Sequence, residues 1–494
     1  MSRAAESLDP SDWESFRQTL HEAADEIVDL LAGVRERAAW RPVPPDVKAA
    51  LSEQAPRGGQ PLDDVVTHFR QLVLPFATGN LHPRFFGWVH GAGTPAGVLA
   101  ELFAAGMNAN VGGREHAPVY VERAVVAWFR ELFGFPEGAS GVLTSGTSMG
   151  NLLAIVAARD AALGEGSRRS GTRGRRLVAY AAAGVHDCVS KAMRIAGLGT
   201  DALRIVEVDD RLAIRLPALR RRIAADRAAG NEPFLIVGTA GSVDAGAFDP
   251  LDALADLCRE ERLWLHVDGA FGALAILSPA HAHLVAGIER ADSLAFDAHK
   301  WLHAPYAVGC VLFRDERAHR AAFSSEPDYL ARAQSGTAAG APWFADYGLE
   351  LSREFRALKV WFTLRHYGFE RLGAAIGRTC ELATLLAERL AAEPEMELLA
   401  PVSLNVVCFR VHPRGLDDEA ELERLNDAIA IAVQESGDAV PSTTRIGGTR
   451  ALRICIVNHR TKEDDLDVLL AAVRRAAAEQ LCAGVVPPSG GETG

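Results

Sequence analysis

A lysine in a mostly apolar stretch is the first residue of this sequence whose type suggests chemistry. The chain carries 52 lysines and arginines, of which only five are lysines: Lys48, Lys191, Lys300, Lys359 and Lys462. Lys300 lies in SLAFDAHKWLHAP (293–305), between two apolar segments and close to a histidine on each side. Unlike a guanidinium, a desolvated ammonium can lose its proton and condense with a carbonyl group as an amine. Two interpretations stay open here: a reactive amine, and a surface lysine that keeps only its charged end in water.

A turn rich in small hydroxyl residues has the form of a phosphate site. GVLTSGTSMGNLLAIVAARD (141–160) passes from an apolar strand through this turn into a helix. Small residues let backbone N–H groups approach an anion, the hydroxyls of Ser145 and Thr147 can donate, and the helix dipole favours negative charge. No Gly-Lys-Ser/Thr follows, so the segment is not a Walker A loop. A plain helix cap is the alternative.

Three other polar groups follow predicted strands. LWLHVDGAFGAL (263–274) ends a strand on Asp268, where cofactors bind in α/β sheets and where a buried carboxylate requires a cationic partner. IVGTAGSVDAGAFD (236–249) places Ser242 or Thr239 at a second strand end, and His186 follows the strand RLVAYAA. A lone histidine in such a place is more often structural than functional.

Together these features fit one ligand, pyridoxal 5'-phosphate. Its phosphate requires hydroxyl and N–H donors, its ring nitrogen a carboxylate, its ring face a flat partner and its aldehyde an amine. A dinucleotide site is the competing interpretation. The nearest glycine pattern, between Gly91 and Gly97, has the wrong spacing and opens no βαβ unit.

The elements that position these residues are predicted from the hydrophobic pattern. Short apolar runs alternate with helical stretches and indicate an α/β fold, with a buried, largely parallel sheet covered by helices on both faces. SDWESFRQTLHEAADEIVDLLAGV predicts an amphipathic helix behind a Ser11 or Asp9 cap. The predicted units are an N-terminal helical arm (1–80), a large domain (81–370), a smaller C-terminal α/β domain (371–485) and a disordered tail (486–494).

Composition narrows the class of protein. With 48% apolar residues, a net charge of −12 and no apolar run of membrane-spanning length, the sequence predicts a soluble protein that binds neither nucleic acid nor membrane. The N-terminus lacks a signal-peptide pattern, so we expect a cytoplasmic protein. Seven scattered cysteines without a C-x-x-C pair predict no disulfide framework and no metal site.

The sequence resembles the pyridoxal-phosphate-dependent group II amino acid decarboxylases. The runs that carry the resemblance are HPRFFGWV, TSGTSMGN, VHDCVSKA, GTAGSVDAGAFDPL, LWLHVDGAFG, FDAHKWL and SREFRALKVWF. The resemblance implies the type I, aspartate aminotransferase-like fold and a homodimer with active sites at its interface. It also implies that Lys300 forms the Schiff base, that Asp268 pairs with the ring nitrogen and that His186 stacks on the ring. The other residues it implies near the cofactor are Ala270, Ser145, Gly146, Thr147, His299 and Ser242.

Two segments leave the substrate and the product open. Aromatic-specific relatives carry bulky side chains in the segments corresponding to GWVHGAG and NANVGGREHAPVYVER, but the second segment is polar here, so acidic, basic and small polar substrates stay open. Residues 326–355 predict a flexible lid. In the family a lid tyrosine protonates the product carbon, and Trp343 or Phe344 lies near that position. We expect Tyr347, oriented by Asp346, to act instead. The alternatives are an oxygen-consuming aldehyde synthase and a non-catalytic cofactor-binding dimer.

Overall fold

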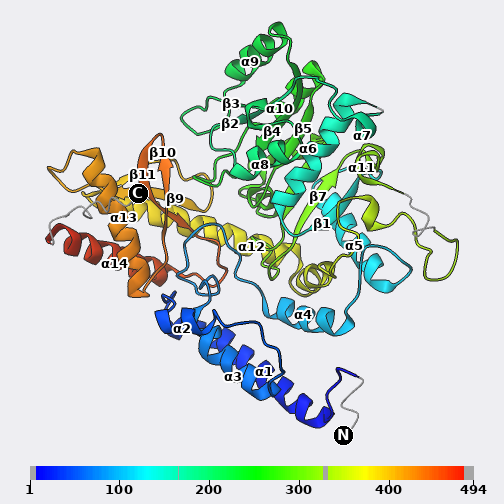
Figure 1. The fold of residues 1–494 in the computed structure, drawn as a ribbon. Helices are drawn as coiled ribbons and strands as arrows, with labels where there is room; N and C mark the ends of the chain where they lie inside the picture. The colour runs from blue at the N-terminus through cyan, green and yellow to red at the C-terminus, as the bar shows by residue number, and fades with distance from the viewer. Residues whose placement is uncertain (1–6, 165, 326–331, 483–494) are drawn as a thin grey trace.

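The computed structural model describes residues 7–164, 166–325 and 332–482 (Figure 1). A seven-stranded sheet wrapped by helices lies on one side, a smaller α/β unit lies beside it, and the N-terminal helices lie along the bottom of the view. The predicted tail at 486–494 lies outside the described residues. None of the described helices has the length and apolar character that crossing a membrane requires.

The large sheet confirms the predicted fold class. Its spatial order is β1-β7-β6-β5-β4-β2-β3, and β7 alone runs antiparallel to its neighbours. All seven strands were expected from apolar runs, because strands covered on both faces need no polar alternation. Their bounds are β1 Ser140–Thr144, β2 Leu177–Ala182, β3 Leu203–Val206, β4 Glu232–Thr239, β5 Trp264–Asp268, β6 Ser293–Asp297 and β7 Gly309–Phe313.

Helices cover both faces of this sheet. Successive side chains of a strand point to opposite faces. In β2, Leu177 and Ala179 pack in the same core as Met193 of α8, whereas Val178 and Tyr180 belong to the core on the other face. The helices of this unit are α4 Pro95–Met107, α5 Ala117–Leu132, α6 Thr147–Leu163, α7 Ser167–Ser170, α8 Asp187–Ile195, α9 Leu216–Ala228, α10 Leu251–Glu261 and α11 Glu316–Phe323.

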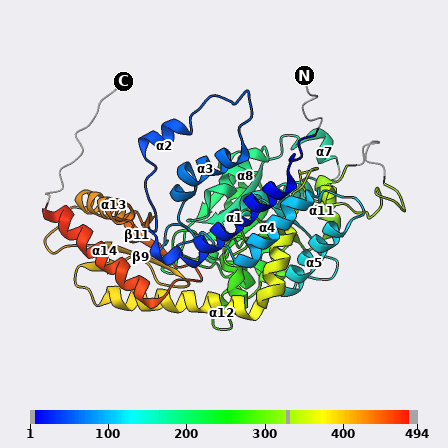
Figure 2. The same cartoon turned by 90° about the horizontal axis from the view of Figure 1, so that it is seen from below.

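A long helix connects the two α/β units. Helix α12 (Ala357–Ala391) runs along the molecule from α4 and α5 to the small sheet and is kinked at Gly368, where φ is 70° (Figure 2). The kink lies two residues before the boundary expected at 370, which remains a prediction. The small sheet is antiparallel in the order β10-β11-β9-β8. The strands and helices of this smaller unit are β8 Met396–Leu398, β9 Val406–Val411, α13 Glu419–Ser436, β10 Ser442–Ile446, β11 Thr449–Cys455 and α14 Glu463–Cys482.

The N-terminal arm consists of α1 (Trp13–Ala32), α2 (Pro45–Ala50) and α3 (Leu62–Leu72). Asp12, rather than the expected Ser11 or Asp9, caps α1, because its side chain accepts hydrogen bonds from the amides of Glu14 and Ser15. Neither α1 nor α3 buries a single residue, although both carry large apolar side chains. The arm therefore has an apolar surface that its own chain leaves uncovered.

Candidate active site

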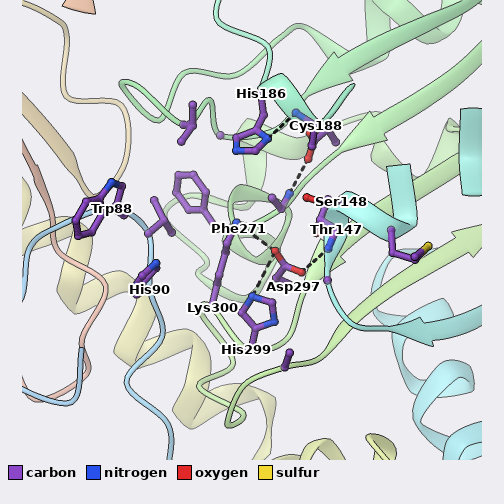
Figure 3. A pocket seen from close by; sticks show the side chains of 18 of the residues that line it. Trp88, His90, Thr147, Ser148, His186, Cys188, Phe271, Asp297, His299 and Lys300 are labelled. Atoms are coloured by element: carbon purple, nitrogen blue, oxygen red, sulfur yellow. Dashed lines mark hydrogen bonds and ion pairs between the residues drawn. The ribbon is translucent and has the colours of Figure 1, made fainter. Parts of the chain in front are cut away.

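A cavity of about 490 Å³ opens at the carboxyl ends of the large sheet. The loops after β1, β2, β4, β5 and β6 all contribute to its walls, because strands that run in one direction end at the same edge of a sheet. The cavity brings together eight of the residues predicted from the sequence, namely Ser145, Gly146, Thr147, His186, Asp268, Ala270, His299 and Lys300. Figure 3 shows several of them pointing toward its centre.

Lys300 follows β6 and points into this cavity (Figure 3). Its Nζ lies 3.1 Å from Oδ2 of Asp297, a buried carboxylate at the end of the same strand. The backbone behind the lysine is closely packed, because a Cβ on Gly91 would lie 2.0 Å from the carbonyl oxygen of His299 and 2.5 Å from that of Lys300. The Lys300 amine therefore has a charge partner, and close packing holds the backbone of this residue in place.

Asp268 ends β5 and is 4% exposed. Its Oδ2 accepts a hydrogen bond from Nδ2 of Asn151 at 2.9 Å, and its Oδ1 accepts one from the amide of Ala270 at 3.2 Å. In the described part of the chain no cation forms an ion pair with it, and burial raises its pKa. A buried carboxylate of this kind is costly without a positive partner. It is suited to a cationic ligand atom in the cavity.

A hydrogen-bond relay holds Asp268 from behind. Oδ1 of Asn151 lies 2.8 Å from Nε2 of His266, whose Nδ1 lies 2.9 Å from the hydroxyl of Ser293. Burial lowers the pKa of His266 to about 3, so this imidazole is neutral at physiological pH. The relay fixes the Asn151 amide with its nitrogen toward the carboxylate. Asn151 and His266 were not predicted from the sequence, although they lie in two of the runs that carry the family resemblance, TSGTSMGN and LWLHVDGAFG.

The turn between β1 and α6 forms the anion-binding side of the cavity. Gly146 caps α6, and the amide of Thr147 donates to Oδ1 of Asp297 at 2.7 Å. Two buried hydroxyls, Thr147 Oγ1 and Thr239 Oγ1, have no hydrogen-bond partner among the described residues, and both residues line the cavity. Buried hydroxyls normally find a partner. The hydroxyls of Ser145 and Ser148, which also line the cavity, add further donors.

His186 combines a structural contact with a place in the cavity. It is the N-cap of α8, and its Nδ1 accepts a hydrogen bond from the amide of Cys188 at 3.1 Å. Because Nδ1 is an acceptor, the ring proton of the neutral imidazole lies on Nε2. The cap thus fixes the ring while Nε2–H stays available, so the structural and functional interpretations of this histidine are compatible.

His299 is buried beside the lysine. Its Nδ1 lies 2.9 Å from the carbonyl oxygen of Val308, and its Nε2 lies 3.7 Å from Oδ2 of Asp297. Burial lowers its pKa. The ring of Tyr306 packs on it with centroids 4.3 Å apart. Both rings therefore form a rigid wall next to the amine.

Ser242 does not line the cavity, contrary to expectation. Its hydroxyl accepts the amide hydrogen of Ala247 at 3.0 Å and so stabilises the turn after β4. Its neighbours Gly241 and Val243 line the cavity instead, as does Thr239 at the end of the strand. Of the two hydroxyls that the sequence left open, Thr239 is the one in position.

Tyr347, the expected proton donor, does not line the cavity of its own chain. It is 7% exposed, its hydroxyl donates to Glu316, and its carbonyl oxygen lies 2.8 Å from Nε2 of His319. In the expected lid, Trp343 and Phe344 are also buried, at 2% and 6% exposed, whereas residues 333–337 are exposed and residues 326–331 lie outside the described residues. The glycine- and alanine-rich composition did not reveal how strongly these aromatic side chains anchor the segment.

A third wall of the cavity is aromatic. Trp88, His90 and Tyr306 line it, with ring centroids 5.9 Å apart for both the Trp88–His90 and the His90–Tyr306 pairs. Phe85 stacks on His90 from behind at 5.7 Å. Trp88 and His90 lie across the cavity from Thr147 (Figure 3). Such rings present flat faces to a ligand.

Comparison with known proteins assigns this geometry to a family. The model of the pyridoxal-dependent decarboxylase conserved domain matches residues 44–412. The chain belongs to the pyridoxal-dependent decarboxylase family. It is 32% identical over 474 residues to the aromatic-L-amino-acid decarboxylase of Bacillus atrophaeus, covering 94% of this chain and 96% of that one. It is 29% identical over 492 residues to the phenylacetaldehyde synthase of Petunia hybrida, covering 96% of each chain.

Solved structures agree with this assignment. The crystal structure of Oryza sativa TDC with PLP and tryptamine superposes with a TM-score of 0.87 at 26% identity, and the match covers 96% of this chain and all of that one. The protein is thus a pyridoxal-phosphate-dependent amino acid decarboxylase of the type I fold, as the resemblance implied. The cavity fits that cofactor, because it combines an amine, a buried carboxylate without a cation and unpartnered hydroxyls.

Replacing Thr147 by valine is expected to weaken cofactor binding without destabilising the apoenzyme. The hydroxyl has no protein partner, so its loss costs the empty protein no hydrogen bond. A lost hydrogen bond to a phosphate costs roughly 1.5–3 kcal/mol, which is roughly a 10- to 150-fold higher dissociation constant. Fluorescence titration of the apoenzyme measures the constant, and thermal unfolding measures stability.

The matched control is Thr379→Val. The Thr379 hydroxyl is buried on α12, away from the cavity, and donates to the carbonyl oxygen of Ile376 at 2.8 Å. This variant should lose stability and keep its cofactor affinity. Equal cofactor affinity in both variants would place the phosphate away from Thr147.

Proposed function

We propose that this enzyme removes the α-carboxylate of an L-amino acid with an aromatic side chain, releasing the amine and carbon dioxide. The observation that carries the proposal is the aromatic wall formed by Trp88, His90 and Tyr306, in which Trp88 stacks on His90 and Tyr306 meets His90 edge to face, and which lines the same cavity as Lys300 and Asp268. The similarity to the aromatic-L-amino-acid decarboxylase of Bacillus atrophaeus supports it.

The polar segment that left other substrates open does not line the cavity of its own chain. Asn110 accepts backbone amides from Gly112 and Arg353, Arg114 lies over the Trp343 ring, and Glu115 accepts from Tyr120. The segment also contains Asn108, Gly112, Gly113 and His116. The side chains of Asn110, Arg114 and Glu115 make local contacts instead of lining the cavity, which supports an aromatic rather than a polar substrate.

The cofactor, when bound, supplies the electron sink for the carbanion that decarboxylation leaves. The residues of the chain then have distinct tasks. Asp297 holds the Lys300 amine in place, and Asp268, fixed by Asn151, holds a proton on the ring nitrogen. When the cofactor is bound, His186 and Ala270 would contact its ring, and Ser145, Thr147 and Thr239 would hold its phosphate.

Two of the polar groups that line the cavity are the candidates for delivering a proton to the product carbon. They are Nε2–H of His186 and the hydroxyl of Tyr306, whose pKa burial raises to about 12. If a proton is delivered to this carbon, the product is the amine. If oxygen reacts with the carbanion first, the product is an aldehyde, as in the name of the Petunia relative. We propose His186 as the donor, because the helix cap fixes its tautomer.

The products and their stoichiometry test this function. We expect one amine and one carbon dioxide per aromatic amino acid consumed, measured by chromatography and carbon dioxide release across a panel of amino acids. His186→Gln should lower amine formation by roughly 10²- to 10⁴-fold, the usual contribution of a general acid. Tyr347→Phe, the matched control, should stay within about 2-fold of wild type, because this tyrosine lies outside the cavity. Aldehyde, ammonia and peroxide in equal yield would reject amine formation, and preference for glutamate or a diamino acid would reject the aromatic substrate.

We also propose that the enzyme is a homodimer. Large apolar side chains are exposed along α1, α3 and α4, including Phe16, Phe69, Leu99, Leu102 and Phe103. Large apolar side chains exposed on several helices are typical of an interaction site. A cytoplasmic location remains part of the proposal and is supported by the free thiols of the described cysteines, six of which are buried.

The dimer is testable by sedimentation. The wild-type enzyme is expected to sediment as two 52.9-kDa chains, and Leu99→Glu should shift it toward the monomer, because a charge placed in an apolar interface is strongly unfavourable. The control is Ile431→Glu, which alters an equally exposed apolar side chain on α13, away from the arm and α4. A monomeric wild-type protein, or equal dissociation of both variants, would contradict this interface.

A further inference from the structure

A second cavity lies behind the loop that carries Lys300. It has a volume of about 730 Å³, in the range of small-molecule sites. Helix α1 of the arm, the start of α4, the kinked part of α12 and residues His459 and Arg460 line it. His303 forms the wall toward the active site, and its amide donates to the carbonyl oxygen of Lys300 at 3.2 Å. The cavity therefore touches the arm, both α/β units and the lysine loop.

Three arginines converge on this cavity without a carboxylate partner. In residues 7–164, 166–325 and 332–482, no acidic side chain forms an ion pair with Arg371, Arg378 or Arg460. Arg378 donates to the carbonyl oxygen of His459 at 2.6 Å, and Arg460 approaches only the carbonyl oxygen of Ala92, at 3.5 Å. Other arginines do find acidic partners; Arg290, for example, binds two aspartates. The cavity thus brings three positive charges together without a counter-charge, in a chain with a net charge of −12.

The histidines of the cavity experience the same uncompensated charge. The rings of His303 and His459 contact edge to face, with centroids 4.8 Å apart. Burial, and then the charges of Arg460, Arg378 and Arg371, lower the pKa of His459 to about 4. Burial and the same surroundings lower the pKa of His303 as well. A partly buried positive field without a counter-charge favours an anionic ligand.

Part of the cavity wall is apolar. Val28, Leu31 and Ala32 of α1 face the cavity, together with Leu372 and the ring of Tyr367. The volume is many times the roughly 30 Å³ that a water molecule occupies in the liquid, so an inorganic ion alone would leave most of it empty. A suitable ligand has an anionic head for the arginines and an apolar body for α1.

We propose that this cavity binds a small organic oxyanion, a carboxylate or a phosphate ester with an apolar body, and that binding fastens the arm to the rest of the enzyme. The guanidinium groups form charge-assisted hydrogen bonds with the head. The body covers the apolar residues of α1. Because α1 buries no residue of its own, the ligand adds a contact that the chain lacks.

Calorimetric titration of the cofactor-saturated enzyme tests the proposal. Hexyl phosphate and hexanoate distinguish the two head groups, hexanol removes the charge, and inorganic phosphate removes the body. We expect binding of at least one of the two amphipathic anions and none of hexanol. Arg378→Gln and Arg460→Gln should each weaken binding at least about tenfold, the loss of one charge-assisted hydrogen bond. Arg365→Gln, which lies on the same helix but outside the cavity, should bind as wild type.

Amide hydrogen exchange gives the second readout. The ligand is expected to slow exchange in α1 of the wild-type enzyme but not in Arg460→Gln. Binding of hexanol with equal affinity, unchanged binding in both arginine variants, or absence of binding to the intact enzyme would overturn the proposal. The absorbance of the bound cofactor should stay constant during the titration, and a change would place the anion in the active site instead. No turnover is measured, so the outcome is independent of the proposed substrate.

Discussion

Replacement of Lys300 by arginine is expected to abolish both covalent cofactor attachment and decarboxylation while leaving the fold intact. A guanidinium stays protonated and does not condense with an aldehyde. Arginine keeps the positive charge beside Asp297, so the buried carboxylate retains a partner and the stability should change little. Absorbance of the bound cofactor and carbon dioxide release measure the two losses, and thermal unfolding measures the fold.

Lys191→Arg is the matched control, because Lys191 is an exposed lysine on α8 outside the cavity. The Lys191→Arg variant should keep the absorbance of the bound cofactor and its full activity. Borohydride reduction of the wild-type enzyme followed by peptide mapping should place the cofactor on Lys300. Label on any of the other four lysines would show that the amine has been misassigned.

Replacement of Asp268 by asparagine is also expected to cause a large loss of turnover. A neutral amide does not hold a proton on the ring nitrogen, and it turns one N–H donor toward Asn151 or the amide of Ala270. Removing one member of a buried charge pair typically costs 3–5 kcal/mol, which corresponds to roughly a 150- to 4,000-fold loss of kcat. Steady-state kinetics at saturating cofactor measures it.

Asp226→Asn distinguishes this effect from general destabilisation. Asp226 is a buried aspartate that pairs with Arg204 and accepts a hydrogen bond from Asn231, away from the cavity. The Asp226 variant should lose stability but keep its kcat. Activity of the Asp268 variant within a few-fold of wild type would mean that another group protonates the ring.

The parts of the candidate site that depend only on which polar residues follow which strands could be predicted from the sequence. Apolar runs followed by polar residues identified the ends of β1, β2, β5 and β6, and parallel strands bring those ends to one edge whatever the details of packing. Thr147, His186, Asp268 and Lys300 therefore meet as expected. The weak, short strands β8 and β10 were missed, because Met396–Leu398 and Ser442–Ile446 carry too little apolar pattern of their own.

Side-chain direction in the turns was decided only by the tertiary structure. Ser242 lies in the expected loop, yet its hydroxyl closes the turn on Ala247, and Thr239 faces the cavity instead. Tyr347 is near the expected lid position, yet packing against His319 and a hydrogen bond to Glu316 hold it in the core. Both outcomes depend on hydrogen bonds whose geometry the linear pattern does not encode.

Contacts between segments that are distant along the chain were the hardest to predict from the sequence. Asn151 reaches Asp268 across 117 positions, and Arg371, Arg378 and Arg460 come from two segments that meet only after α12 packs between the two units. Hydrophobic periodicity reports which residues are buried, because burial acts on each side chain separately. Which polar groups are buried together depends on how whole elements dock, and that arrangement exists only in the folded chain.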